Sequence, residues 1–110
     1  MYTRASAIEY TLKFLQECQK LPVKIDKAIL FGSILNNKNH EDSDIDLALF
    51  SNSFTQNILD NLDLIGMVNI HYPEIDVHTF STKDFDLAES SLLFEIKTTG
   101  IEISPQTNEI

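Results

Sequence analysis

The sequence of 110 residues contains a single cysteine, Cys18, and no start-of-chain segment with the pattern of a secretory leader. One cysteine cannot form a disulfide within the chain, and small secreted domains often depend on several disulfides. Uninterrupted apolar runs such as Ala28 to Phe31 and Leu47 to Phe50 are only four residues long. A membrane-spanning helix needs roughly 20 apolar residues. We therefore expect a cytoplasmic protein that does not enter a membrane.

Basic residues are scarce as well. The sequence has 8 lysines and arginines and 17 acidic residues, which gives a formal net charge of −9. Proteins hold nucleic acid largely by neutralising its phosphates with lysine and arginine. Direct binding of nucleic acid is therefore not expected, whereas cations or a basic partner protein suit this charge. The sequence leaves open whether the chain assembles as a homo-oligomer or a hetero-oligomer.

The composition, with 43% hydrophobic and 23% charged residues, is that of a folded globular protein. A chain of this length can bury one hydrophobic core but not two. We predict a single domain over residues 1–104, followed by a flexible C-terminal tail over residues 105–110.

Apolar residues at helical spacing predict three helices. The first runs from Thr3, its N-cap, to Lys20. The second follows a capping cluster at 51–53 and continues to about Val68, and the third spans 91–99 and is closed by Gly100. The side chains predicted to face inward are Ile8, Leu12, Leu15, Phe54, Ile58, Leu62, Ile65, Leu92, Leu93 and Ile96.

Strands are predicted at 24–31, 44–50 and 75–80, with a short edge strand at 101–103 and a capped turn at 81–84. The apolar run before Gly32 suits a strand buried on both faces, and 75–80 alternates apolar and polar residues. Helices and strands in this order predict a small α/β sandwich of two layers, in which helices cover a sheet.

One motif organises the chain: a strand ending in Gly32-Ser33, ten intervening residues, and then Asp44 and Asp46 at the start of the next strand. Glycine lets the backbone turn sharply and approach a ligand, and free N–H groups after it can bind an anion. The two aspartates share one strand face and lie about 7 Å apart. They can therefore bind one divalent cation.

Asp76 lies on the predicted strand 75–80 and supplies a third carboxylate. Three carboxylates around one or two Mg²⁺ or Mn²⁺ ions are typical of phosphoryl or nucleotidyl transfer. His78 shares a strand face with Asp76, so we also consider it as a neighbour of the site. His40, His71 and His78 have no metal-ligand spacing, and a zinc site is not expected.

The set formed by Gly32-Ser33, Asp44, Asp46 and Asp76 resembles the nucleotidyltransferase superfamily of DNA polymerase beta, and the small size resembles its minimal prokaryotic members. The resemblance implies a nucleotidyltransferase fold, with a small mixed β-sheet covered by helices mainly on one face. It also implies ATP as donor, Gly32 and Ser33 at the phosphates, Asp44 and Asp46 as metal ligands, and Asp76 as the third metal-binding carboxylate, which activates the acceptor. Such proteins are typically paired with a HEPN-type helical toxin encoded nearby, which they silence by transferring AMP to a tyrosine.

Relatives usually carry an arginine and a second glycine soon after the Gly-Ser pair, whereas Ser33 is followed by Ile-Leu-Asn-Asn, with Lys38 as the nearest cation. This difference motivates a second hypothesis, a non-catalytic subunit that binds and masks its partner. A third is nucleotidyl transfer to a small molecule such as an aminoglycoside. Larger relatives bind such an acceptor with a separate helical domain that we do not expect here, so the acceptor surface would have to come from a partner.

Overall fold

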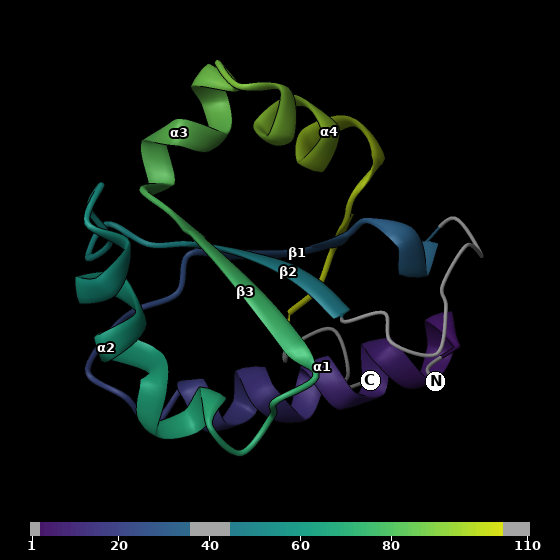
Figure 1. The fold of residues 1–110 in the computed structure, drawn as a ribbon, viewed down its shortest axis with the longest axis vertical. Coiled ribbons are helices and arrows are strands. Elements are labelled where there is room, and N and C mark those ends of the chain that lie inside the picture. The colour runs from purple at the N-terminus through teal and green to yellow at the C-terminus, as the bar shows by residue number, and fades with distance from the viewer. Residues whose placement is uncertain (1–2, 36–44, 105–110) are drawn as a thin grey trace.

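The computed structural model describes residues 3–35 and 45–104 of the chain. A sheet of four strands runs through the middle of the molecule. Helices α1 and α2 lie on one side of it and α3 and α4 on the other (Figure 1). The elements in chain order are α1 (Arg4–Cys18), β1 (Lys27–Phe31), the 3₁₀ helix η1 (Ser33–Leu35), β2 (Ile45–Phe50), α2 (Ile58–Asn69), β3 (Ile75–Phe80), α3 (Thr82–Leu87), α4 (Ser91–Thr99) and β4 (Ile101–Glu102).

The sheet has the strand order β3-β2-β1-β4 and is mixed. β1 is antiparallel to both β2 and β4, whereas β2 and β3 are parallel and are connected through α2. A parallel pair needs such a crossover, because its second strand must start at the same end of the sheet as the first. The end of β1 and the starts of β2 and β3 therefore meet at one end of the sheet.

Alternation along the strands divides the core between the two faces of the sheet. Leu30, Leu47 and Leu49 belong to the cluster that packs against the longer helices α1 and α2. Phe31 and Phe50 belong to a smaller cluster on the other face, together with residues of α3 and α4. The predicted fold class, a small mixed sheet with helices, is confirmed. The predicted number of two layers is wrong, because α3 and α4 add a layer on the second face of the sheet (Figure 1).

Helices α3 and α4 leave part of their face of the sheet uncovered. α3 begins directly after β3, and the ring of Phe85 lies 5.5 Å from the ring of Phe50 and at right angles to it. Phe50 is at the C-terminal end of β2, paired with Phe80 at the C-terminal end of β3. Helix α3 therefore covers the end of the sheet opposite to the starts of β2 and β3.

Three elements agree with the prediction from the sequence, namely α1, β3 and α4. Thr3 caps α1, where its hydroxyl accepts from the backbone N–H of Ser6 at 3.1 Å, and β3 and α4 have the predicted bounds. Strand β1 is shorter than predicted and starts at Lys27. The capped turn predicted at 81–84 is the first part of helix α3. Most of the ten residues between Ser33 and Asp44, and the tail predicted at 105–110, lie outside the described residues.

The predicted start of the second helix is wrong. α2 begins at Ile58, and the side chain of Asn57 caps it by accepting from the N–H of Asp60 at 3.1 Å. The earlier cluster has a different role, because Ser51 is buried and its hydroxyl donates to the carbonyl of Lys24 at 2.6 Å. This hydrogen bond therefore links the end of β2 to the segment before β1.

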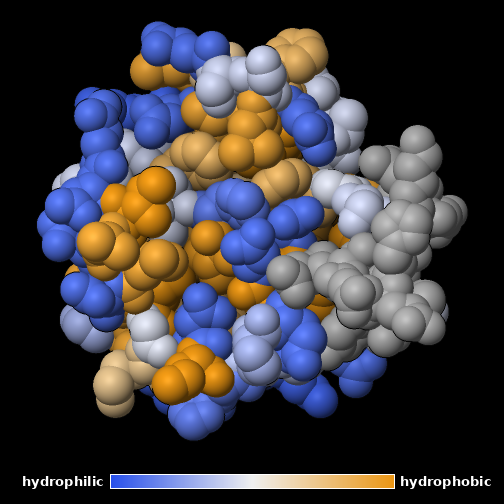
Figure 2. Space-filling model, in the orientation of Figure 1, coloured by the Kyte–Doolittle hydropathy of each residue, from blue (hydrophilic) through white to orange (hydrophobic). Residues whose placement is uncertain are grey.

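Two side chains predicted to face inward are instead exposed. Ile58, the first residue of α2, is 64% exposed although helical spacing places it on the same side as buried Ile65, and Leu92 is 37% exposed. The inner face of α2 carries buried Asn61, whose amide donates to the carbonyl of Thr55 at 2.7 Å and to the hydroxyl of Thr79 at 3.0 Å. Apolar side chains consequently reach the surface on the side where α2 lies (Figure 2). Among the described residues, no helix has the length and apolar character needed to cross a membrane.

Cys18 is buried in the last turn of α1, and we predict that it is chemically inert in the folded protein. Burial raises the pKa of its thiol from 9.0 to about 12, and the neighbouring charge of Glu17 adds to this rise. The thiolate, which is the reactive form, is therefore absent near neutral pH. Iodoacetamide at pH 8 is expected to leave the native chain unmodified and to label it rapidly in urea. Because the folded-state pKa is raised, the free energy of unfolding should also fall as the pH rises above about 9.

Rapid labelling of native Cys18 under these conditions would contradict the burial of the thiol. The matched comparison is the same chain in urea, since it carries no other cysteine to obscure the result.

Candidate active site

Two carboxylates predicted for the site lie side by side on the uncovered part of the sheet. Asp46 on β2 pairs directly with Asp76 on β3, and both point to the face that carries α3 and α4. Asp46 is half-buried, whereas Asp76 is exposed. The parallel pairing of β2 with β3 thus brings together two carboxylates that are 30 positions apart in the sequence.

His78 completes a cluster of three side chains with these carboxylates. Its Nε2 lies 3.3 Å from Oδ1 of Asp46 and 3.5 Å from Oδ2 of Asp76. The Phe31 ring packs against the imidazole in a T-shaped arrangement, with ring centres 5.1 Å apart. The hydrogen bond to Asp46 raises the pKa of His78, burial opposes this rise, and the negative charges of both aspartates add to it. His78 is therefore a member of the site and not only a neighbour of Asp76.

Gly32 lies directly against Asp46. It follows Phe31, the β1 residue that pairs with Asp46, and has a φ of +88°. A Cβ at this position would overlap the Oδ2 atom of Asp46, so the site has no space for a larger residue. The chain then enters the 3₁₀ helix η1 at Ser33, and the N–H of Leu35 donates to the carbonyl of Gly32 at 3.1 Å. A short helical turn therefore follows the Gly-Ser pair directly.

The cluster fits a divalent cation. One ligand atom from each of Asp46, Asp76 and His78 lies within 4.8 Å of the other two. Adjacent ligand atoms around a small divalent ion bound at about 2.1 Å are about 3 Å apart, close to the nitrogen–oxygen separations found here. Carboxylate oxygens suit Mg²⁺ and Mn²⁺, and an imidazole nitrogen favours transition metals such as Mn²⁺. Asp44, the other predicted metal ligand, lies outside the described residues.

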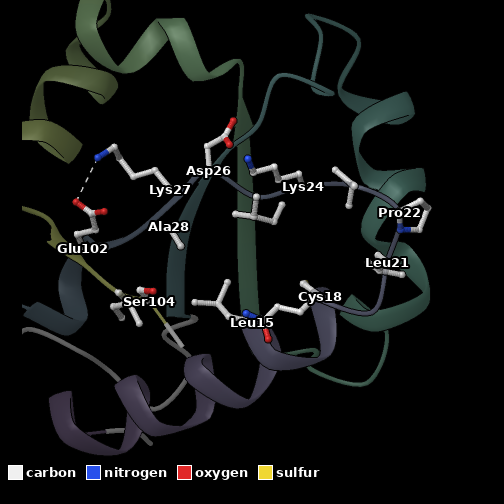
Figure 3. Close-up of a pocket in the computed structure, with 14 residues that line it drawn as sticks. Leu15, Cys18, Leu21, Pro22, Lys24, Asp26, Lys27, Ala28, Glu102 and Ser104 are labelled. Carbon is white, nitrogen blue, oxygen red and sulfur yellow. Dashed lines mark hydrogen bonds and ion pairs between the residues drawn. The ribbon is translucent and has the colours of Figure 1, made fainter. Parts of the chain in front are cut away.

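A cavity of about 490 Å³ lies elsewhere, near the start of β1 and the C-terminal end of α1. Figure 3 shows Leu15 and Cys18 on one side of it, and Lys27 paired with Glu102 at 3.2 Å on another. Gly32 and the aspartates are at the other end of β1. The cavity is therefore separate from the carboxylate cluster, which lies on an open face of the sheet.

A mixed sheet that presents paired aspartates beside a tight glycine turn has the arrangement required for metal-assisted phosphoryl or nucleotidyl transfer. The family described as "Nucleotidyltransferase domain" matches residues 11–98. Because this match spans most of the chain, the protein belongs to the nucleotidyltransferase domain family. A comparison with curated proteins found no match.

Two solved structures have a similar fold. A candidate nucleotidyltransferase from Sulfolobus solfataricus is 15% identical, with a TM-score of 0.61, over 76% of this chain and 75% of the other. A toxin–antitoxin structure with AMP-PNP is 22% identical, with a TM-score of 0.53, over 93% of this chain and 77% of the other. At these identities the similarity concerns the fold alone.

The structure brings together Asp46, Asp76 and Gly32, three of the site residues predicted from the sequence. One sequence signal for His78 is its position two residues from Asp76, which places it on the same strand face. The predicted roles of Ser33 at the phosphates and of Asp44 at the metal stay predictions. Ser33 is placed at the start of η1, next to Gly32.

Proposed function

We propose that this protein transfers AMP from ATP to the hydroxyl of a tyrosine on a HEPN-type helical toxin encoded beside it, and thereby acts as a cytoplasmic antitoxin. The observation that carries the proposal is the pairing of Asp46 with Asp76 on neighbouring strands, directly against Gly32. Membership of the nucleotidyltransferase domain family supports the type of reaction. The fold shared with a toxin–antitoxin structure that contains AMP-PNP supports the kind of partner and donor.

In this proposal each residue of the site has one task. Asp44, Asp46 and Asp76, joined by His78, hold Mg²⁺ or Mn²⁺, which neutralises charge on the phosphates when bound. Backbone N–H groups after Gly32 receive the phosphates. Asp76 is the most accessible of the described ligands and accepts the proton of the acceptor hydroxyl. The tyrosine oxygen forms a bond to the α-phosphorus, the bond from that phosphorus to the β-phosphate oxygen breaks, and pyrophosphate leaves.

The test is incubation of the purified protein with ATP labelled at the α-phosphate, Mg²⁺ or Mn²⁺, and the purified product of the neighbouring gene. Label is expected on that product, at a tyrosine, and should be found by mass spectrometry as an added AMP. ATP labelled at the γ-phosphate is the matched control and should transfer nothing. Absence of α-label from the product would refute the proposal. Protection of cells by a variant lacking both Asp46 and Asp76 would instead favour masking without catalysis.

We also predict that the site binds Mn²⁺ more tightly than Mg²⁺, because His78 offers nitrogen beside two carboxylates. Titration calorimetry without nucleotide should show this order. Replacing His78 with alanine is expected to weaken Mn²⁺ binding about tenfold. The same replacement should change Mg²⁺ binding much less, since Mg²⁺ prefers oxygen ligands.

His71 provides the matched control for this prediction, because it lies in the turn before β3 and away from the carboxylates. His71→Ala should bind both ions as the native protein does. Equal losses of Mn²⁺ and Mg²⁺ affinity in the His78 variant would show that the imidazole only positions Asp46.

A further inference from the structure

Helix α2 presents an apolar stripe to solvent on the side away from the sheet. Leu59 and Met67 on α2, and Ile70 at its C-cap, are 74%, 79% and 74% exposed, the highest fractions among large apolar side chains of the described residues. At the angular spacing of an α-helix they fall on the side opposite to buried Asn61 and Ile65. Figure 2 shows apolar side chains at the surface where α2 lies, with hydrophilic ones beside them. The stripe is therefore left unpacked by the described part of the chain.

Gly66 lies on the same side of α2, in the interior of the helix. Glycine weakens a helix relative to alanine, and it is usually required only where the backbone is unusual or another group comes close. A Cβ on Gly66 would meet no atom within 4 Å, in contrast to the close contacts at Gly32 and Gly100. The described fold gives no reason for glycine here. A helix of another molecule packed against this position would supply one, because glycine lets two helices approach closely.

The charged residues of α2 itself are both acidic. Asp60 and Asp63 are exposed on α2, and the sequence contains no lysine or arginine between Lys38 and Lys83. Asp63 lies within the stripe, one turn from both Leu59 and Met67. A two-fold contact between copies of this chain would place the same patch on both sides, so aspartates would meet aspartates without a cation. The charge therefore suits a different protein with a basic helix.

We propose that this surface, formed by Leu59, Asp63, Gly66, Met67 and Ile70, docks a helix of a partner protein that carries lysine or arginine beside an apolar stripe. The apolar side chains would supply most of the affinity, and Asp63 would pair with the basic residue. Because α2 packs on the sheet face opposite to Asp46 and Asp76, docking and nucleotidyl transfer use different surfaces. The inference rests on the proposed function only for the choice of partner, the helical protein encoded beside this one.

The test measures binding of the purified neighbouring gene product by surface plasmon resonance. Met67→Glu and Asp63→Lys are each expected to weaken binding at least about tenfold. Asp63→Asn should also reduce the dependence of the affinity on salt. Phe94→Glu is the matched control, because Phe94 is 61% exposed on α4, and it should bind as the native protein does. Gly66→Leu should weaken binding while the thermal midpoint stays at or above the native value, which shows that the fold is intact.

Other outcomes would overturn the proposal in distinguishable ways. Native-like binding by both Met67→Glu and Asp63→Lys would refute this surface and leave the transferase function standing. Loss of a native dimer in sedimentation experiments on Met67→Glu would show that a second copy, and not a partner protein, covers the stripe. Failure of the native chain to bind the neighbouring gene product would refute the partner assigned here and in the proposed function. Intact binding without transfer of label would refute the transferase function alone.

Discussion

Replacing Asp46 with asparagine is expected to lower the rate of AMP transfer about 10³-fold, equivalent to about 4 kcal/mol in the activation barrier. Asp46 is the centre of the described site, because it pairs with Asp76, is close to His78 and lies against Gly32. Asparagine has nearly the same shape but no charge, so it cannot neutralise a divalent cation. The measurement is the initial rate of α-label transfer at saturating ATP, with native protein and variant compared at equal concentration.

The fold should survive this change. In the absence of metal, Asp46 and Asp76 repel each other across the paired strands, and removal of one charge relieves that repulsion. The thermal midpoint of Asp46→Asn is therefore expected to stay near the native value. Asp86→Asn removes an exposed carboxylate on α3 and is the matched control for net charge. Transfer by Asp46→Asn at the native rate, or an equal loss in Asp86→Asn, would contradict the assignment of the site.

The strongest local signals in the sequence predicted the helices and strands best. Thr3 before an amphipathic run located α1, and the alternation from Ile75 to Phe80 located β3 without error in either bound. Gly100 marked the end of α4 correctly. In each case the decisive interaction, a cap or an alternating face, lies within the segment itself, so neighbouring parts of the fold have little influence on it.

The start of α2 could not be predicted because two capping groups compete for it. Both Ser51 to Ser53 and Asn57 have side chains that favour the N-cap position. The hydrogen bond from Ser51 to the carbonyl of Lys24, 27 positions earlier in the chain, decides between them. That partner is brought close only by the antiparallel pairing of β1 with β2, which no local pattern encodes. The exposure of Ile58 follows from the later start.

The site shows the same division between local and long-range information. Alternation places Asp76 and His78 on one face of β3 whatever the fold. Their contact with Asp46 depends on the parallel register of β2 and β3, in which Ala48 pairs with His78. A slip of one residue would turn the side chains of β3 to the other face. The carboxylates needed for the chemistry can therefore be predicted from the sequence, whereas the position of His78 between them cannot.

Gly32→Ala is the second change for which we expect a large effect, on both stability and activity. The φ of +88° at Gly32 is unfavourable for alanine, and the added Cβ would overlap the carboxylate of Asp46. Together these effects should lower the free energy of unfolding by about 2 kcal/mol or more. Asp46 must turn aside to make room, and a displacement of about 1 Å at a reacting site can cost about 10²-fold in rate. Chemical denaturation and the label-transfer assay measure the two effects.

The other two glycines make this prediction specific to the site. Gly100→Ala would bring a Cβ against Ile29 and the carbonyl of Ile96, so it should also destabilise the fold, but it lies away from Asp46. Gly66→Ala meets open space in a helix and should stabilise the protein by up to about 1 kcal/mol. If Gly32→Ala and Gly100→Ala lost activity only in proportion to their loss of folded protein, Gly32 would be needed for the fold alone. A much lower rate per folded molecule in Gly32→Ala would show that the glycine makes the space in which the carboxylate of Asp46 is held.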